Sequence, residues 1–207
     1  MAGHILWAYA HPKEAEGLDL PDCVQLGVGK IEATLALSRR LSSALPDAVV
    51  NFGVAGCFPG FGLDVGDVCL VVEETLADEG LVSEAGFEDL RALGLADAVR
   101  WSADAALVSD VAEAVPGVAQ VRGTTVSTIS GTDALARAYA SRVTPAVESM
   151  EGAAVARVCQ AFGVPWVQLR SISNRVGARE RGGWDLRLAK ARLHDAVRTV
   201  LAALSSG

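Results

Sequence analysis

Short apolar runs alternate with amphipathic stretches along the chain, and the clearest pair lies within residues 150–169. The apolar run 164–169 follows Gly163 and ends at a polar segment that closes with Asn174. A short apolar run with such boundaries predicts a buried parallel strand. Residues 150–162 carry apolar side chains at helical spacing, so they predict a helix leading into this strand. Asn174 is thereby expected at the carboxyl end of the strand.

The same alternation runs through most of the chain. The opening residues 4–10 predict a first strand that runs into a loop at His11-Pro12. Further strands are predicted at 23–28 and 118–127. The stretch between them predicts one strand that begins at 48, a glycine-rich loop, and a second strand that ends near Glu73. Helices are predicted at 30–45, 132–142 and 184–204. This order predicts an α/β fold, a three-layer α/β/α sandwich around a central mixed, largely parallel and partly barrel-like sheet, with ligand groups at strand ends.

Length and composition favour one domain without a membrane span. The 207 residues contain no Pro- or Ser-rich linker, so a single domain over 1–207 is expected. No apolar run approaches the ~18 residues that cross a bilayer, and the start of the chain lacks the features of a secretory signal. We therefore expect a soluble, cytoplasmic protein with no membrane partner. The net charge of −7 argues against nucleic acid as a partner.

The cysteines and histidines show no metal-binding pattern. The four cysteines lack CxxC spacing, and the three histidines form neither HExxH nor another zinc-ligand cluster. We expect neither a metal ion nor a disulfide.

Glu151 stands at the start of the helix predicted over 150–162, where its carboxylate suits a sugar. A helix dipole stabilises negative charge in the first turn, and an ionised carboxylate can accept two hydrogen bonds at once. A vicinal diol, such as the 2'- and 3'-hydroxyls of ribose, supplies two such donors. The alternative is an ordinary first-turn glutamate, since negative charge is favoured at helix starts in general.

The segment around Glu151 resembles the nucleoside phosphorylase and nucleosidase superfamily, in which a Met-Glu pair precedes a helix and an Asp or Asn follows the next strand. In that family the Met packs on the sugar and the Glu holds its diol; the corresponding pair here is Met150 and Glu151. The strings MEGAAVARVC and RSISNRVGARERGGW look most like futalosine hydrolases, which remove hypoxanthine from a precursor of menaquinone.

This resemblance covers most of the chain and is weakest over 79–118. It implies a purine nucleoside phosphorylase-like fold, a small-molecule nucleoside substrate, no cofactor and a homo-oligomer. The chain departs from the subfamily at two positions, where Ser149 replaces an expected Asn and His11 replaces a Met or Val. Both changes are expected to alter the rim of the pocket rather than the chemistry.

Glu14 is the candidate general base. In adenosine-type nucleosidases the matching loop carries a water-activating Glu three residues after the position that aligns with His11, and Glu14 has that spacing. Glu16 is the local competitor. A carboxylate near C1' of the ribose can take a proton from water as it attacks.

The loop at 51–56 favours water over phosphate as the nucleophile. Phosphorylases of the superfamily resemble RVGSCG here, with the Arg and Ser binding phosphate, whereas this chain reads NFGVAG. Asn51 and Val54 take those positions, and the charge of Glu14 would repel phosphate. The glycines of the loop, Gly56 among them, allow backbone N–H groups to approach a ligand closely, although they also suit a plain loop.

Asn174 is the candidate for stabilising the departing base. The adenosine-type nucleosidases have an Asp there that can protonate N7, and an amide has no such proton to give. Its NH₂ offers two donors, which suit the acceptors N7 and O6 of a 6-oxopurine such as hypoxanthine. An Asn can also bind adenine through N7 and the 6-amino group, and it can simply cap a turn.

Six further residues are candidates for lining the pocket. Around the end of the strand predicted at 118–127, small hydroxyls can contact a ligand or form local turns: Ser127, Thr128, Ser130 and Thr132. GARERGGW resembles a G-x-R-x4-W motif of the futalosine subfamily. This implies that Arg179 clamps the carboxylate at the 5' end of futalosine and that Trp184 stacks on its aromatic ring. The alternative for Arg179 is a solvated basic loop.

Other functions stay open at this point. A nucleosidase for an adenine nucleoside, of the methylthioadenosine or aminodeoxyfutalosine type, differs only in the base. A purine nucleoside phosphorylase would need phosphate and would release ribose 1-phosphate. A non-catalytic nucleoside-binding protein could use the same scaffold, and the presence of Glu14 argues against it.

Overall fold

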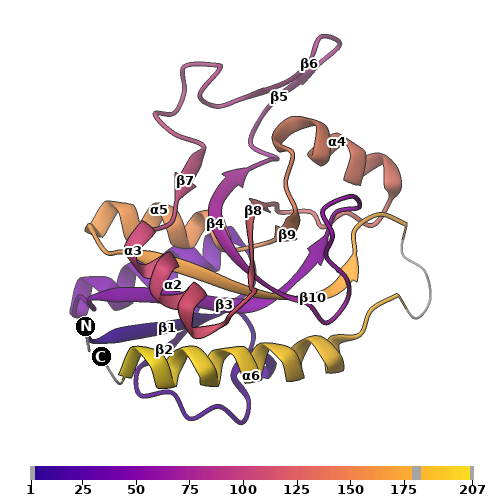
Figure 1. Ribbon diagram of the computed structural model, residues 1–207. Coiled ribbons are helices and arrows are strands. Elements are labelled where there is room, and N and C mark those ends of the chain that lie inside the picture. The colour runs from indigo at the N-terminus through magenta and orange to yellow at the C-terminus, as the bar shows by residue number, and fades with distance from the viewer. Residues whose placement is uncertain (1–2, 179–182, 206–207) are drawn as a thin grey trace.

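An eight-stranded mixed sheet forms the centre of the structure, a computed structural model that describes residues 3–178 and 183–205 (Figure 1). The strands of this sheet are β1 (Ile5–Tyr9), β2 (Cys23–Gln25), β3 (Ala48–Cys57), β4 (Val68–Leu76), β7 (Arg100–Ser102), β8 (Ala119–Thr125), β9 (Val147–Ser149) and β10 (Trp166–Arg175). A separate hairpin pairs β5 (Gly80–Ser83) with β6 (Gly86–Asp89).

β10 closes part of this sheet into a barrel. It pairs in parallel with β3, from Trp166 opposite Val49 onward, and antiparallel with β4, where Gln168 lies opposite Val71. The path β10-β4-β8-β9-β3 therefore returns to β10, and β1 and β2 extend the sheet beyond β3. The predicted partly barrel-like sheet is confirmed.

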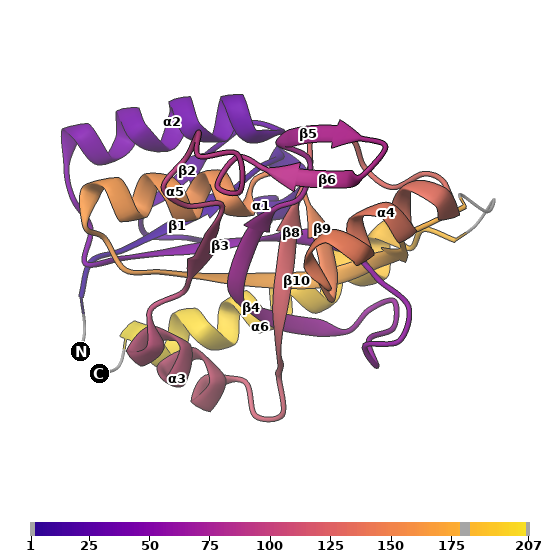
Figure 2. The ribbon, with the colours of Figure 1, turned by 90° about the horizontal axis from the view of Figure 1, so that it is seen from above.

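Helices cover both faces of the sheet, which gives three layers (Figure 2). The helices are α1 (Pro12–Ala15), α2 (Lys30–Ser43), α3 (Ala105–Ala114), α4 (Asp133–Val143), α5 (Gly152–Phe162) and α6 (Leu186–Ser205). α2 and α5 share one apolar core with the sheet, built from residues such as Leu37 and Val155. α3 and α6 share the opposite core, which includes Val111 and Leu193. The predicted three-layer α/β/α sandwich is confirmed.

Several boundaries differ from those predicted. The strand expected at 164–169 continues through Ser171, Ser173 and Asn174, which are buried. These polar residues do not end the strand, because β10 pairs with β3 through this stretch and Ser173 Oγ hydrogen-bonds to Ala55 and Asn174. Asn174 therefore lies inside β10, and Glu151 precedes α5 at its N-cap instead of standing in its first turn.

Other elements escaped the sequence pattern. The loop expected after His11 contains the single-turn helix α1, and the poorly patterned stretch 79–118 holds β5, β6, β7 and α3. Short, exposed strands such as β5 and β6 give little periodicity to read. No helix in the described part of the chain is long and apolar enough to cross a membrane.

A chain of buried polar side chains crosses the interior of the barrel. Glu74 is fully buried, and it accepts hydrogen bonds from Thr125 Oγ1 at 3.0 Å and from Gln168 Nε2 at 2.5 Å. Gln168 Oε1 in turn accepts from Asn51 Nδ2 at 2.5 Å and from Arg170 Nη2 at 2.9 Å. Neutral amides thus connect a buried carboxyl group to a buried guanidinium group.

Burial dominates the titration of Glu74. Loss of hydration raises its pKa to about 7, against the opposing effects of the Gln168 hydrogen bond and the Arg170 charge. Two glycines make room for this carboxyl, since a Cβ at Gly123 or Gly152 would lie 2.4 or 2.2 Å from Glu74 Oε1.

Replacing Glu74 by Gln should flatten the dependence of stability on pH. The folded pKa of about 7 exceeds the ordinary value of 4.5, so folding takes up a proton between these values. The contribution of Glu74 to the free energy of unfolding is complete below the unfolded pKa and is lost as pH rises through the folded pKa. As the pH rises across this window, the free energy of unfolding of E74Q should fall by about 1–3 kcal/mol less than that of the wild type. Urea denaturation at several pH values measures the difference.

Glu73→Gln is the matched control on the same strand, because Glu73 lies near the surface, 3.6 Å from Arg100. It should keep the steep wild-type profile. An E74Q protein with that same profile would contradict the assignment.

Candidate active site

A cavity of about 390 Å³ opens where β1, β3 and β10 end, beside the start of α5. Six of the residues singled out from the sequence line it: Glu14, Gly56, Met150, Glu151, Asn174 and Trp184. They come from α1, β3, the turn before α5, β10 and the segment before α6, so only the folded chain brings them together. Their chemical roles stay predictions.

Glu14 is held in place by backbone groups. Its Oε2 accepts hydrogen bonds from the N–H groups of Ala10 and His11, and its Oε1 accepts from Val54 N–H, each at 3.0 Å. The bonds to His11 form a capping box, in which the His11 side chain also caps the start of α1. Residues 51–56, expected to be a loop, belong to β3, because their backbone pairs with β10. Val54 of β3 and the start of α1 therefore fix one orientation of the carboxylate at the edge of the cavity.

Glu16, the alternative base, points elsewhere. Its side chain is 72% exposed and pairs with Lys190 of α6 at 2.7 Å. It does not belong to the described lining of the cavity. Of the two glutamates, only Glu14 is in position to contact a bound ligand.

Glu151 faces the cavity with one oxygen already engaged. The N–H of Gly29 donates to its Oε1 at 2.8 Å, so the glycine turn before α2 holds the carboxylate from behind. The side chain makes no cap for α5. Burial raises the pKa of Glu151, while the charge of Arg170 and the Gly29 hydrogen bond act to lower it.

Arg170 is a site residue that the sequence analysis missed. It is 1% exposed, and a Cβ at Gly53 would lie 2.2 Å from its Nη1 and 2.6 Å from Glu14 Oε1. Gly53 therefore lets the guanidinium group approach Glu14 closely. The available signal was an arginine within an otherwise buried strand, since a buried arginine needs acidic or polar partners.

Asn174 presents an oriented amide. Ser173 Oγ lies 2.8 Å from Asn174 Oδ1, and Asn174 Nδ2 donates to the carbonyl of Arg175 at 3.1 Å. If the amide oxygen and nitrogen of Asn174 were exchanged, the amide oxygen would face the carbonyl oxygen of Arg175, and neither atom can donate a hydrogen bond. One N–H group of Nδ2 is thereby left for a ligand, whereas the sequence analysis assigned both to the base.

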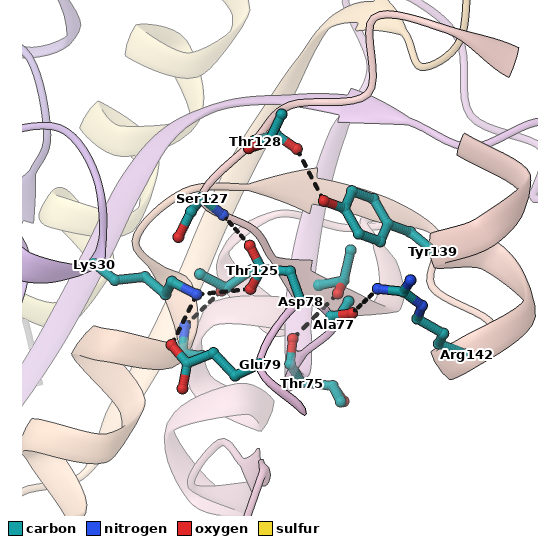
Figure 3. Close-up of polar contacts among 12 residues, drawn as sticks. Lys30, Thr75, Ala77, Asp78, Glu79, Thr125, Ser127, Thr128, Tyr139 and Arg142 are labelled. Atoms are coloured by element: carbon teal, nitrogen blue, oxygen red, sulfur yellow. Dashed lines mark hydrogen bonds and ion pairs between the residues drawn. The ribbon is translucent and has the colours of Figure 1, made fainter. Parts of the chain in front are cut away.

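Ser127 and Thr128 do not belong to the described lining, contrary to expectation. The N–H of Ser127 donates to the carboxylate of Asp78, which pairs with Lys30 at 2.6 Å, and the carbonyl of Thr128 accepts from Tyr139 Oη at 3.2 Å (Figure 3). Asp78 and Tyr139 hold this turn outside the cavity. Of the other two hydroxyl candidates, Ser130 lines the cavity together with Ile129 and Gly131, whereas Thr132 caps the start of α4.

Glu148 is a second lining residue that the sequence analysis passed over. It is 5% exposed, its Oε1 accepts from Ser130 N–H at 2.8 Å, and its Oε2 accepts from Ser130 Oγ. Burial raises its pKa, and the Ser130 hydrogen bonds act in the opposite direction. Its signal was an acidic residue just before the Met-Glu pair.

The remaining expectations concern the rim. His11 and Ser149, the two departures from the subfamily, both line the cavity. Trp184 lines it as well, and its backbone forms an antiparallel bridge with Asn174. Arg179 lies outside the described residues. Within residues 3–178 and 183–205, no three His, Cys, Asp or Glu side chains are grouped as a metal site requires.

Comparison with known proteins points to one family. Residues 22–206 match the family described as the phosphorylase superfamily. Futalosine hydrolase of Thermus thermophilus is 35% identical over 86% of this chain and 80% of that protein. The Streptomyces coelicolor enzyme of the same name is 36% identical over 89% and 80%. A 5'-methylthioadenosine/S-adenosylhomocysteine nucleosidase of Chromohalobacter salexigens is 31% identical over 84% and 75%.

Solved structures share the fold at lower identity. Native futalosine hydrolase of Helicobacter pylori superposes with a TM-score of 0.82 at 18% identity, covering 96% of this chain and 97% of that one. The methylthioadenosine/S-adenosylhomocysteine nucleosidase of Neisseria meningitidis, in complex with methylthio-immucillin-A, gives 0.81 at 22% identity, with 95% and 97% covered.

Proposed function

The chain belongs to the phosphorylase superfamily and is a hydrolase of N-glycosidic bonds, and we propose that it cleaves futalosine to hypoxanthine and dehypoxanthine futalosine in menaquinone biosynthesis. The observation that carries this proposal is the cavity itself. An oriented carboxylate, Glu14, shares that cavity with a second carboxylate, Glu151, and with the amide of Asn174.

Glu14 acts as the general base. As the bond from C1' to N9 breaks, positive charge grows on the sugar and negative charge on the purine, and a water must attack C1'. The backbone hydrogen bonds at Ala10, His11 and Val54 hold the carboxylate of Glu14 ready to take the proton from that water. Such a base typically contributes ~10²–10⁴ in rate.

Glu151 holds the ribose. Gly29 occupies one side of Oε1, so Oε2 and the remaining lone pair of Oε1 can accept from the 2'- and 3'-hydroxyls. Met150, beside it in the cavity lining, packs against the sugar. The charge of Arg170 beneath the site favours the ionised form of Glu151, which is the form that accepts both hydrogen bonds.

Asn174 stabilises the departing base. Its free N–H points at the acceptor edge of the purine and steadies the negative charge there without giving up a proton. Gly56 makes room for this amide, because a Cβ at this position would be 3.0 Å from Asn174 Nδ2.

The 5' end of the substrate extends toward Trp184. Futalosine carries a carboxyphenyl ketone there, and we infer that Trp184 stacks on its ring and that Arg179 binds its carboxylate. Both assignments rest on the resemblance of GARERGGW to the subfamily motif.

A nucleosidase for an adenine nucleoside is the second candidate. It is favoured by relatives such as the Exiguobacterium methylthioadenosine/S-adenosylhomocysteine nucleosidase, which is 34% identical over 82% of this chain. A phosphorylase is a more distant alternative, because Asn51 is buried against Gln168 and the Val54 N–H is engaged by Glu14. A non-catalytic binding protein would have no use for the fixed carboxylate of Glu14.

Incubation with futalosine in phosphate-free buffer should release free hypoxanthine. Chromatography of the products identifies the base, and parallel reactions with inosine and methylthioadenosine, each with and without phosphate, test the alternatives. Adenine as the preferred product would favour the second candidate. A strict phosphate requirement would overturn the hydrolytic mechanism.

Glu14→Gln should lower kcat by about 10²–10⁴ with a much smaller change in KM, because the amide keeps the shape of the carboxylate and loses its basicity. Glu16→Gln is the matched control, since its exposed carboxylate pairs with Lys190 away from the cavity. The control should retain wild-type kinetics. Equal losses in both variants would refute the role of Glu14.

We also infer that the protein forms a homo-oligomer through α2. Ile31 is 82% exposed and Leu35 43% exposed on one helical face, and Val28 just before it is 53% exposed and also lines the cavity. Such adjacent apolar side chains favour burial against a second copy. Ile31→Lys should therefore lower the mass measured by light scattering after size-exclusion chromatography, while Thr199→Lys, at an exposed position of α6 on the opposite face of the sheet, provides a control for added charge. A wild-type protein that elutes as a monomer would contradict this inference.

A further inference from the structure

The register of three strands places Glu148 opposite Asn174 with a glycine between them. Asn174 of β10 pairs with Gly56 of β3, and Gly56 pairs with Glu148 of β9 on its other side. Directly paired residues on neighbouring strands project from the same face of a sheet. Asn174 and Glu148 therefore face the same cavity from its two sides, and both belong to its lining.

The gap between them has the dimensions of a flat base. Neighbouring strands lie about 4.7–4.9 Å apart, so the backbones of β10 and β9 are separated by about 10 Å across β3. Position 56 tolerates no side chain, since a Cβ there would lie 3.0 Å from Asn174 Nδ2 and 2.8 Å from Val176 Cγ1, so glycine keeps the floor of this gap low and leaves the Asn174 amide in place. A planar bicycle can rest on Gly56 with one edge toward each side chain.

Glu148 has acceptor capacity left for a ligand. Ser130 donates one hydrogen bond to each oxygen, through its N–H to Oε1 and its hydroxyl to Oε2. A carboxylate offers about four acceptor positions, so both oxygens can accept again. The Ser130 bonds also orient the group, and its burial limits competition from water.

The two common purines present opposite patterns to such a pair. In hypoxanthine the edge reads N7 acceptor, O6 acceptor and N1–H donor. In adenine it reads N7 acceptor, 6-amino donor and N1 acceptor. An amide N–H followed by a carboxylate complements the first pattern, and the carboxylate would repel the N1 lone pair of adenine.

We propose that Glu148 selects 6-oxopurine nucleosides by accepting a hydrogen bond from N1–H while Asn174 donates to the N7/O6 side of the same base. This rests on the proposed function of the cavity as a nucleosidase site and names its specificity-determining residue. Glu148 contacts the base and takes no part in activating water.

Inosine and adenosine provide the direct test, because they share the ribose and N7 and differ at N1, which Glu148 faces, and at the substituent on C6. The wild type should prefer inosine in kcat/KM. Glu148→Ala should lower kcat/KM for inosine by about 10–100-fold and leave that for adenosine within a few-fold. Glu148→Gln should move the preference further toward adenosine, because its amide can donate to N1.

N1-methylinosine is the matched substrate control. It keeps O6 and N7 but has no N1–H, so the wild type should discriminate against it and Glu148→Ala should do so much less. Ser130→Ala, which removes the hydroxyl donor to Oε2, should weaken the inosine preference by a smaller factor. Melting temperatures of all variants separate a change of specificity from loss of folding, and the isosteric Glu148→Gln serves if the Ala variant unfolds.

Two failures are distinguishable. If Glu148→Ala and Glu148→Gln lower kcat/KM equally for inosine and adenosine, the role of Glu148 is only to stabilise the turn at Ser130. The inference is then wrong, and the hydrolase assignment is unaffected. A wild-type preference for adenosine would also overturn it. If the wild type hydrolyses none of futalosine, inosine and adenosine, the proposed function is wrong. The inference about Glu148 is then wrong as well, because it rests on that function.

Discussion

The double pairing of β10 is the constraint on which the site depends. Parallel pairing with β3 and antiparallel pairing with β4 close the barrel and remove any freedom of register along β10. Arg170 is thereby fixed inside the barrel, next to Gly53, and Asn174 is fixed at the rim, next to Gly56. A slip of one residue would exchange the two faces of β10, which would turn Arg170 out of the barrel and Asn174 away from the cavity.

Several charged side chains lie around β10, and burial and the attraction between them act in opposite directions on the pKa values of two of the carboxyl groups. Glu14, Glu151 and Glu74 surround a single buried guanidinium, Arg170, whose charge lowers the pKa values of Glu151 and Glu74 against the effect of burial. No neutral substitute for Arg170 would leave these carboxyls in the same states, because burying charge without a partner is costly. Backbone N–H groups at Ala10, His11 and Val54 donate to Glu14, that of Gly29 donates to Glu151, and the side chains of Thr125 and Gln168 donate to Glu74.

The sequence signalled those site residues that sit in local motifs. Glu151 stands at a predicted helix start and Asn174 follows an apolar run, so short-range patterns mark these two, whereas Glu14 was found through the resemblance of its loop to adenosine-type nucleosidases. Glu148 and Arg170 carry weaker signals, an acidic residue near the Met-Glu pair and an arginine in an apolar strand. Their significance arises from neighbours far along the chain, Gly56 for Glu148 and Gly53 for Arg170. The same holds for Ser127 and Thr128, whose exclusion from the cavity results from Asp78 and Tyr139.

The amino-acid sequence by itself determined the α/β class, most helices and strands, and the family, because apolar periodicity and motifs such as MEGAAVARVC are encoded over a few residues. Tertiary structure alone decided the closure of the barrel, the exact extent of β10, the one remaining N–H of Asn174 and the pairing of Glu148 with Gly56. These depend on strand register between segments separated by up to about half the chain. Such contacts form only when the whole sheet is assembled, so no local pattern records them.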